Sequence, residues 1–144
     1  KHMAITQAMP SSYKTEIMTG VHNHSATTGD VFKVALYTSA ATLGAATTAY
    51  TTVNEVVGTG YTAGGITLTN VTPVLSGTVA YTDFADVAWT NATFTARGAL
   101  IYNSSKANRA VAVLDFGSDK VVSAGTFTLQ FPTPDATNAI IRIA

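Results

Sequence analysis

The sequence predicts a mainly β fold, either an antiparallel β-sandwich or a barrel-like domain, with a short N-terminal helix and long Thr/Ala/Gly-rich loops. Segments with strand-like patterns recur about every 8 to 15 residues, which is typical of sandwiches and barrels. Thr, a β-branched residue that favours strands, occurs 25 times. The 144 residues suit a single domain, residues 1–144. Residues 1–2 are interpreted as cloning residues, because a common restriction site encodes His-Met, which leaves an arm at residues 3–30 and a β-domain at residues 31–144.

The N-terminal arm contains one helical signal. Residues 10–12 (Pro-Ser-Ser) supply candidate caps, residues 13–18 can form about two helical turns, and Gly20 is a suitable stop. Residues 21–30 are then predicted to form a polar loop.

The first predicted strand is residues 32–37, where apolar side chains alternate at Phe32, Val34 and Leu36. The next segment, residues 38–65, is rich in Ala, Thr and Gly and cannot fill a core. Structureless loops of that length are uncommon in compact domains. We therefore expect a long excursion across a surface or onto a neighbouring subunit.

From Ile66 onward the pattern is that of an all-β module. Residues 93–102 and 109–116 alternate on both sides of a turn at residues 103–108, which predicts a hairpin. Residues 117–125 are predicted to form a loop. The other predicted strands are residues 66–72, 79–82, 86–89, 126–131 and 140–143.

Charge is scarce in this chain. Charged residues make up 11%, and eight acidic residues cancel eight basic ones. Binding through nucleic-acid phosphates needs a basic patch, and a spanning helix needs an apolar run of about 18 residues or more. We expect neither a nucleic-acid nor a membrane partner. A neutral surface gives little electrostatic protection against self-association, so copies of the same chain are candidate partners.

His22 and His24 are weak metal candidates. Two histidines at i and i+2 of a strand share a face and could hold zinc, with Asp30 as a third ligand. No further native His completes the set, and the absence of Cys excludes thiolate ligands and disulfides. The favoured alternative is a solvated or interface loop, and no cofactor is predicted.

No catalytic constellation stands out. Ser and Thr are plentiful, but a nucleophile needs a positioned base, and the chain has few His and no Gly-x-Ser-x-Gly motif. Asp83 and Asp86 are the candidate carboxylate pair for glycoside cleavage, although a charged turn is the commoner explanation. Residues 58–65 are glycine-rich but lack the Lys-Ser/Thr of a phosphate loop. We expect no enzymatic activity.

The same glycine-rich segment is a candidate contact loop. Gly60, Gly64 and Gly65 can provide positive φ and close backbone approach. Tyr61 lies among them, and we expect it to be an exposed aromatic residue available for a contact.

For Trp89 and Arg97 the sequence predicts structural roles. Trp89, the only Trp, is expected to plug the core, with sugar stacking or an interface as alternatives. Arg97 lies mid-strand among apolar neighbours, where an unpaired charge is costly. Asp115 on the predicted partner strand, or Asp83 or Asp86, could form a structural ion pair with it.

Five blocks are distinctive when taken in order: FKVALYT at residues 32–38, GTGYTAGG at 58–65, TARGALIYN at 95–103, NRAVAVLDFG at 108–117 and GTFTLQFP at 125–132. In this order the chain resembles a group of small virion structural proteins of tailed bacteriophages and their prophages, over residues 12–143. The resemblance implies location in the virion, assembled in the bacterial host cytoplasm, with other virion proteins and copies of itself as partners. Head decoration, head–tail joining and tail attachment all stay open, and no catalytic residues are carried over.

Two functions follow as hypotheses. The first is a non-enzymatic virion structural protein that forms a homo-oligomer and binds a capsid or tail lattice in many copies, gaining strength through avidity. The alternative is a carbohydrate-binding, adhesin-like module that uses Tyr61, Trp89 or Tyr102 as exposed stacking platforms.

Overall fold

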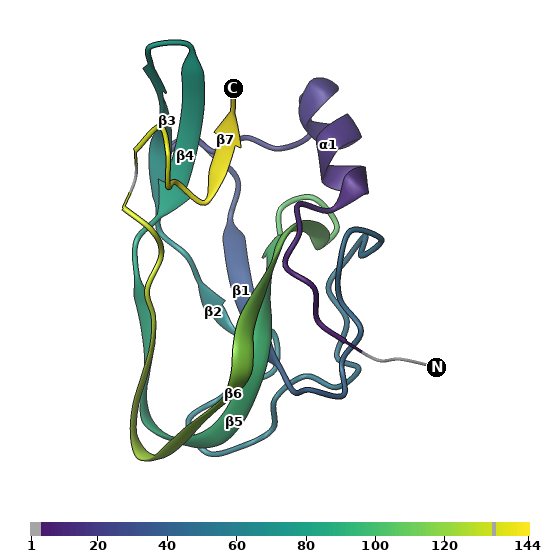
Figure 1. Cartoon of the computed structure of the whole chain (residues 1–144), viewed down its shortest axis with the longest axis vertical. Helices are drawn as coiled ribbons and strands as arrows, with labels where there is room; N and C mark the ends of the chain where they lie inside the picture. Colours follow the sequence, from purple (N-terminus) through teal and green to yellow (C-terminus); the bar gives the residue numbers. More distant parts are fainter. Residues whose placement is uncertain (1–3, 134) are drawn as a thin grey trace.

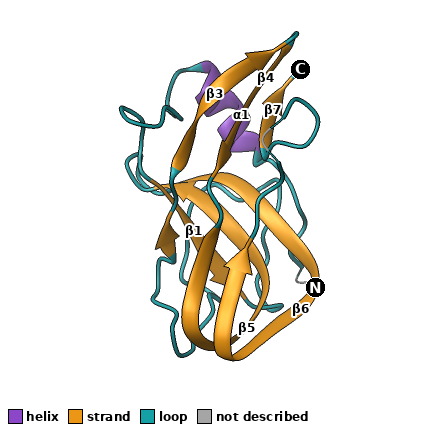
Figure 2. Ribbon diagram, turned by 90° about the vertical axis from the view of Figure 1, so that its left-hand side faces the viewer, coloured by secondary structure: helices purple, strands orange, loops and turns teal. Residues whose placement is uncertain are grey.

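The computed structural model describes residues 4–133 and 135–144, and the mainly β prediction is confirmed (Figures 1 and 2). Its elements are α1 Ser11–Met18, β1 Phe32–Tyr37, β2 Ile66–Thr67, β3 Asn70–Ser76, β4 Val79–Phe84, β5 Val87–Asn103, β6 Arg109–Leu129 and β7 Ile141–Ile143. Two antiparallel sheets form, one of order β2-β1-β5-β6 and one of order β3-β4-β7. The sheets do not close into a barrel, so the sandwich-like form of the prediction is the one that fits.

Strands β5 and β6 form one long, bent hairpin, which dominates the lower part of Figure 1. Strand β5 joins two predicted strands through an irregularity around Asn91 (φ 48°). Strand β6 continues through residues 117–125, so the predicted loop there was wrong. Gly117 (φ 81°) and Ala124 (φ 47°) take left-handed conformations, and the register shifts near Ala124. Bulges of this kind bend a ladder without ending it.

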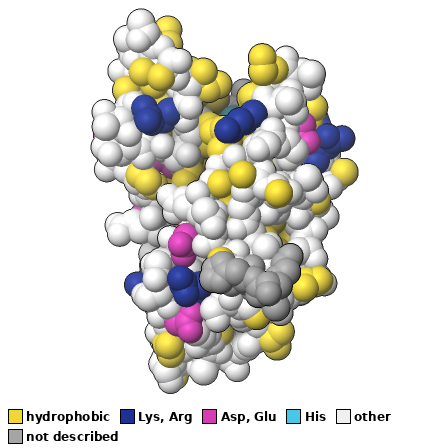
Figure 3. Space-filling view, turned by 45° about the vertical axis from the view of Figure 1, so that its right-hand side comes forward, with side chains coloured by type: hydrophobic (Ala, Val, Ile, Leu, Met, Phe, Trp, Pro, Cys, Tyr) yellow, Lys and Arg dark blue, Asp and Glu magenta, His cyan; other side chains and the backbone are white. Residues whose placement is uncertain are grey.

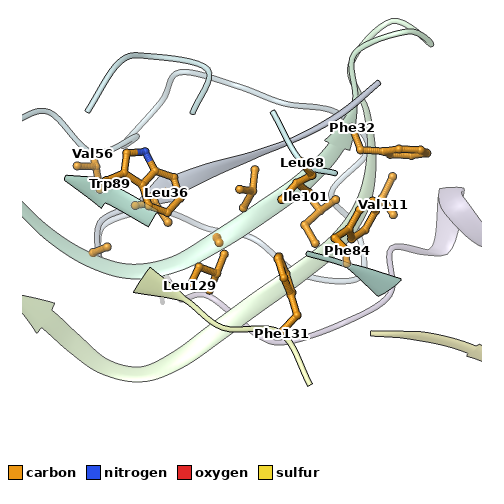
Figure 4. Packing of buried hydrophobic residues seen from close by; sticks show 14 of the residues in the cluster. Phe32, Leu36, Val56, Leu68, Phe84, Trp89, Ile101, Val111, Leu129 and Phe131 are labelled. Carbon is orange, nitrogen blue, oxygen red and sulfur yellow. The ribbon is translucent and has the colours of Figure 1, made fainter. Parts of the chain in front are cut away.

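The main core contains the apolar face of β1 that the sequence predicted. Phe32, Val34 and Leu36 are fully buried. Trp89 is only 5% exposed and lies in the same cluster, as expected. Figure 4 shows the side chains of this cluster, which come from separate strands and loops. Other large members are Leu68, Phe84, Phe94, Ile101, Val111, Leu129 and Phe131.

The excursion at residues 38–65 lies on its own sheet, so the expectation that it cannot contribute to a core was wrong. Ala41 and Leu43 join Tyr37 and Leu100 in a second buried cluster. Strand β1 is therefore buried on both faces, with both sets of its alternating side chains covered. Small side chains suffice there because they let a loop layer approach the sheet closely.

The N-terminal arm also folds back on the same sheet. Ile5 belongs to the second cluster, and Ala8 forms an antiparallel bridge with Val113. The start of the arm thus packs against its own domain.

Helix α1 begins at Ser11, two residues earlier than predicted. Pro10 occupies the N-cap position and makes no side-chain capping bond, so the two serines lie inside the helix. Proline suits this point because its fixed φ is compatible with a helix start. Gly20 (φ 75°) follows the C-terminal end, as expected for a stop. Tyr13 is the buried residue of the helix and ties it to the body.

Candidate assembly surface

The predicted contact loop at residues 58–65 folds against the protein's own sheet. Gly65 (φ 79°) passes so close to β1 that an added Cβ would overlap the Val34 carbonyl oxygen. Gly60 (φ 81°) and Gly64 (φ 96°) are also left-handed. All three glycines therefore supply positive φ, and Gly60 and Gly65 also allow close backbone approach, as expected. Tyr61, however, is half-buried and packs against the main core, so the expectation that its side chain is exposed was wrong.

Glu55, which sequence analysis missed, lies just before this loop and is the shared acceptor of the hydrogen bonds that hold it. Its Oε1 accepts a hydrogen bond from the Tyr50 hydroxyl (2.7 Å). Its Oε2 accepts from the Tyr61 hydroxyl and from the Gly64 N–H (2.8 Å). No Lys or Arg pairs with it in the described part of the chain. A signal did exist, because Glu55 is the only acidic residue between positions 31 and 82.

The tyrosines around Glu55 remain protonated donors at neutral pH. Burial, followed by the hydrogen bond to Glu55, raises the pKa of Tyr61 far above its usual range. Burial and the Glu55 charge raise the pKa of Tyr102 to about 12. The Tyr102 hydroxyl in turn donates to the Gly64 carbonyl oxygen (2.6 Å). The hydrogen bonds of this cluster join the loop to the sheet, which is a structural role.

Residues 21–30 form a loop, as predicted, but His22 and His24 within it are buried, so the expectation that these two histidines are solvated was wrong. The His24 ring lies flat on Phe32, with centroids 4.5 Å apart and planes at 11°. Its Nε2 is 2.8 Å from the Tyr13 hydroxyl oxygen. When that hydroxyl donates to Nε2, the ring proton sits on Nδ1, which has no hydrogen-bond partner among the described residues. Burial, then the nearby His22, lowers the pKa of His24 to about 4.

His22 uses both of its ring nitrogens within the protein. Nε2 is 2.9 Å from Glu16 Oε1, and Nδ1 is 3.0 Å from Asn103 Nδ2. Among the hydrogen bonds of the described residues, neither histidine contacts a Ser or Thr hydroxyl that it could activate. Residues 4–133 and 135–144 contain no group of three or more His, Cys, Asp or Glu side chains placed to hold a metal ion.

Asp83 and Asp86 serve the backbone in the structure. Asp83, at the end of β4, is 2% exposed, and its Oδ1 accepts from the Phe84 N–H (2.7 Å). Asp86 is exposed, and its Oδ1 accepts from the Phe131 N–H (2.8 Å). Burial, with a smaller contribution from Asp86, raises the pKa of Asp83. Asp86 thus lies exposed in the connection between β4 and β5, as expected for a charged turn, whereas Asp83 is a buried residue of β4.

The structure places Arg97 beside Asp115, the partner strand residue named from the sequence. Arg97 Nε is 3.5 Å from Asp115 Oδ1, and both side chains are about one-third exposed. Surface pairs of this kind contribute about 0–1 kcal/mol, so the contact orders the β5–β6 hairpin locally without dominating its stability.

The carbohydrate-binding alternative loses the platforms on which it depended. Trp89 is 5% exposed and Tyr102 is 2% exposed, while Tyr61 is half-buried. The Tyr50 and Tyr102 rings stack on each other, with centroids 4.6 Å apart. Sugar stacking requires an accessible aromatic face, and none of the three predicted residues offers one.

A cleft of about 300 Å³ opens between α1 and the β3-β4-β7 sheet. We call it the helix cleft. Tyr13 and Ile17 line its helix side, Ile141 and Ile143 line its sheet side, and His24 is among its lining residues. No Asp, Glu, Lys or Arg lines it. Figure 3 shows a hollow at the upper end of the molecule, with hydrophobic side chains on both sides and Lys or Arg side chains near its rim.

Large apolar side chains are exposed at the same end of the molecule, where α1, β3 and β7 lie (Figure 1). Leu75 on β3 is 69% exposed, and Ile143 on β7 is 57% exposed. Strand β3 is an edge strand that is exposed from Thr72 to Ser76. Pro73 and the irregular register beside it limit pairing of this edge with another strand. The surface therefore favours contact through side chains.

Comparison of the chain with protein-family models, with curated proteins and with solved structures gave no match. The one helix among the described residues, α1, is too short and too polar to cross a membrane.

Proposed function

We propose that this protein is a non-enzymatic structural component of a tailed-phage virion, present in repeated copies on the capsid or at the head–tail or tail region. Its partners are copies of itself and other virion proteins. The observation that carries the assembly part of the proposal is the exposed, uncharged edge strand β3 with Val74 and Leu75 on its surface. Exposed apolar groups of this kind mark interaction sites.

Charge supports the same proposal. The chain is neutral overall, with a sequence pI of about 7.0, and no charged residue occurs between Val56 and Thr82. Neutral, apolar surfaces associate readily because no like charges oppose their contact. The assignment to a tailed-phage particle depends, in addition, on the resemblance of the five sequence blocks, taken in order, to small virion proteins.

The first experiment measures solution mass by light scattering at several protein concentrations. We expect a defined multiple of 14.9 kDa for the native chain, and a shift to monomer for Leu75→Lys. Val57→Lys is the matched control, because Val57 is 94% exposed but lies in the 38–65 excursion, away from β3. A strict monomer at every concentration, or equal effects of the two lysines, would refute assembly through β3.

A second experiment tests the particle. Tailed particles induced from the bacterium that carries the gene are purified and probed with gold-labelled antibody against this chain. We expect label at a fixed position on each particle. Purified particles that carry neither label nor peptides of this chain in mass spectrometry would exclude the virion assignment.

A further inference from the structure

We propose that the tip of the β3–β4 hairpin of one copy, residues 74–77, seats in the helix cleft of a second copy. The inference rests on the proposed function, because it names the interface through which the copies associate. It identifies the donor surface and the acceptor surface on the same chain.

The acceptor is the helix cleft. Its walls are apolar side chains of α1 and β7, among them Ile17, Ile141 and Ile143. Its volume of about 300 Å³ lies at the small end of the range for binding pockets, which suits a few side chains of an inserted turn. The cationic side chains near its rim (Figure 3) disfavour a basic occupant and leave an uncharged one unaffected.

The donor is the hairpin tip. Val74 is 47% exposed and Leu75 is 69% exposed. Gly77 makes the turn with φ 62°, and a Cβ placed there would meet no atom within 4 Å, so the turn projects free of the body. In Figure 1 the β3–β4 hairpin forms the upper extremity of the molecule. About half or more of each of these two side chains, Val74 and Leu75, is left uncovered by the described residues.

The two surfaces match in charge and polarity. Residues 57–82 contain no charged side chain, and no Asp, Glu, Lys or Arg lines the cleft. Burial lowers the pKa of His24, one of its lining residues, to about 4, which keeps that ring neutral at pH 7. Bringing the two surfaces together buries apolar area, at about 25 cal/mol per Å², without the desolvation of an unpaired charge. A second copy is therefore the occupant that the chain itself supplies.

The cleft also offers one unused polar group. His24, which lines the cleft, has a buried Nδ1 without a hydrogen-bond partner. A tight turn exposes backbone carbonyl oxygens, which are acceptors. A backbone carbonyl is the kind of partner that this N–H lacks, and buried polar groups without a partner gain most from acquiring one.

Donor and acceptor lie at the same end of the molecule (Figure 1). Two copies can therefore meet end to end about a two-fold axis and exchange their hairpin tips reciprocally. A reciprocal contact doubles the buried surface and closes the assembly as a dimer. A one-way contact would instead extend into a ring or filament, which is equally compatible with seating of the tip.

Because the chain contains no Cys, a disulfide can form only between cysteines that are introduced. Chains carrying Leu75→Cys are mixed with size-tagged chains carrying Ser25→Cys. Ser25 is one of the residues that line the cleft. The control mixture pairs Leu75→Cys with Val57→Cys. We expect the cleft pair to cross-link at least about tenfold faster than the control, because residues in a bound interface have a high effective concentration.

The outcomes separate this interface from the proposed function. If light scattering shows an oligomer but both mixtures cross-link equally, assembly stands and seating of the tip in the cleft is overturned. If the chain is monomeric and no pair cross-links selectively, the interface and self-assembly fall together. Native chains, which carry no Cys, are also added in excess and should lower the cross-linking of the cleft pair, because their tips and clefts compete with those of the Cys chains. Unchanged cross-linking in that excess would contradict the inference.

Discussion

At the scale of single residues, polar groups hold the loops of this protein to its sheet. Glu55 accepts three hydrogen bonds from the loop that contains it. His22 and Asn103 connect the arm to the β5–β6 turn. Each group sits in an apolar setting where an unmet donor or acceptor costs about 1–3 kcal/mol. These few contacts therefore decide whether long, small-residue segments stay in place.

Removal of the Tyr61 hydroxyl tests this view. That hydroxyl donates to Glu55 and accepts from the Leu36 N–H (2.9 Å). We expect Tyr61→Phe to lower the free energy of unfolding by about 1–3 kcal/mol, measured by urea denaturation. Tyr81→Phe is the control, because no hydrogen bond of the Tyr81 hydroxyl is seen in the described structure. Equal losses in the two variants would contradict the role of Glu55.

His24 predicts a specific pH dependence of stability. Its pKa is about 4 in the folded protein and 6.5 when free. The unfolded chain therefore binds the proton more readily between these values, so stability falls as the pH drops from about 6.5 to 4, by about 3 kcal/mol. The groups that act on it are His22, which lowers the pKa, and Asp30, which raises it.

The measurement compares unfolding free energies of the native chain and His24→Phe from pH 7 to pH 4. Carboxylates titrate in both proteins, so the difference between the two curves isolates the histidine. We expect the variant to lose less stability than the native chain on acidification. Parallel curves would show that His24 is not buried in its neutral form.

At the scale of elements, the excursion at residues 38–65 is a cover for the sheet. It crosses back over β1 at Gly65, where backbone meets backbone. Its amides also bond to the sheet, as in Val56 N–H to Leu36 O (2.9 Å). The excursion and the sheet therefore depend on each other, since without the cover one face of β1 would be exposed.

Two glycine substitutions separate strain from steric overlap. Gly20 and Gly65 both have φ near 75–79°, but only Gly65 has atoms where a Cβ would stand. We expect Gly20→Ala to cost about 1 kcal/mol and Gly65→Ala about 4 kcal/mol or more. Thermal unfolding gives the difference. If Gly65→Ala does not fold while Gly20→Ala does, the difference still assigns the loss to the overlap at Gly65, because the two glycines share the same φ region.

At the scale of the whole molecule, low charge governs behaviour in solution. The described ion pairs are few, and two of them, Arg109–Glu16 and Lys106–Asp30, fasten the arm to the β5–β6 hairpin. The net charge is zero at neutral pH. Association of such a surface depends on apolar contact, which salt does not screen.

We therefore expect the oligomer to persist with little change between about 50 mM and 500 mM NaCl, where the Debye length shortens severalfold. The mass is measured by light scattering at fixed protein concentration. Dissociation on raising the salt concentration would indicate that exposed charges, and not the apolar end of the molecule, hold the copies together.

Sequence alone determined the fold class, the β1 strand, the β5–β6 turn and the burial of Trp89, because alternation and turn residues are local signals. It also named Asp115 as a partner for Arg97, since register follows from a hairpin. It did not reveal that residues 117–125 continue a strand, because bulges let loop-like residues stay in a ladder. Burial of His22, His24 and Tyr61, the role of Glu55 and the helix cleft were decided only by the tertiary structure. Those features depend on segments far apart in the chain that meet only when the excursion and the arm fold back onto the sheet.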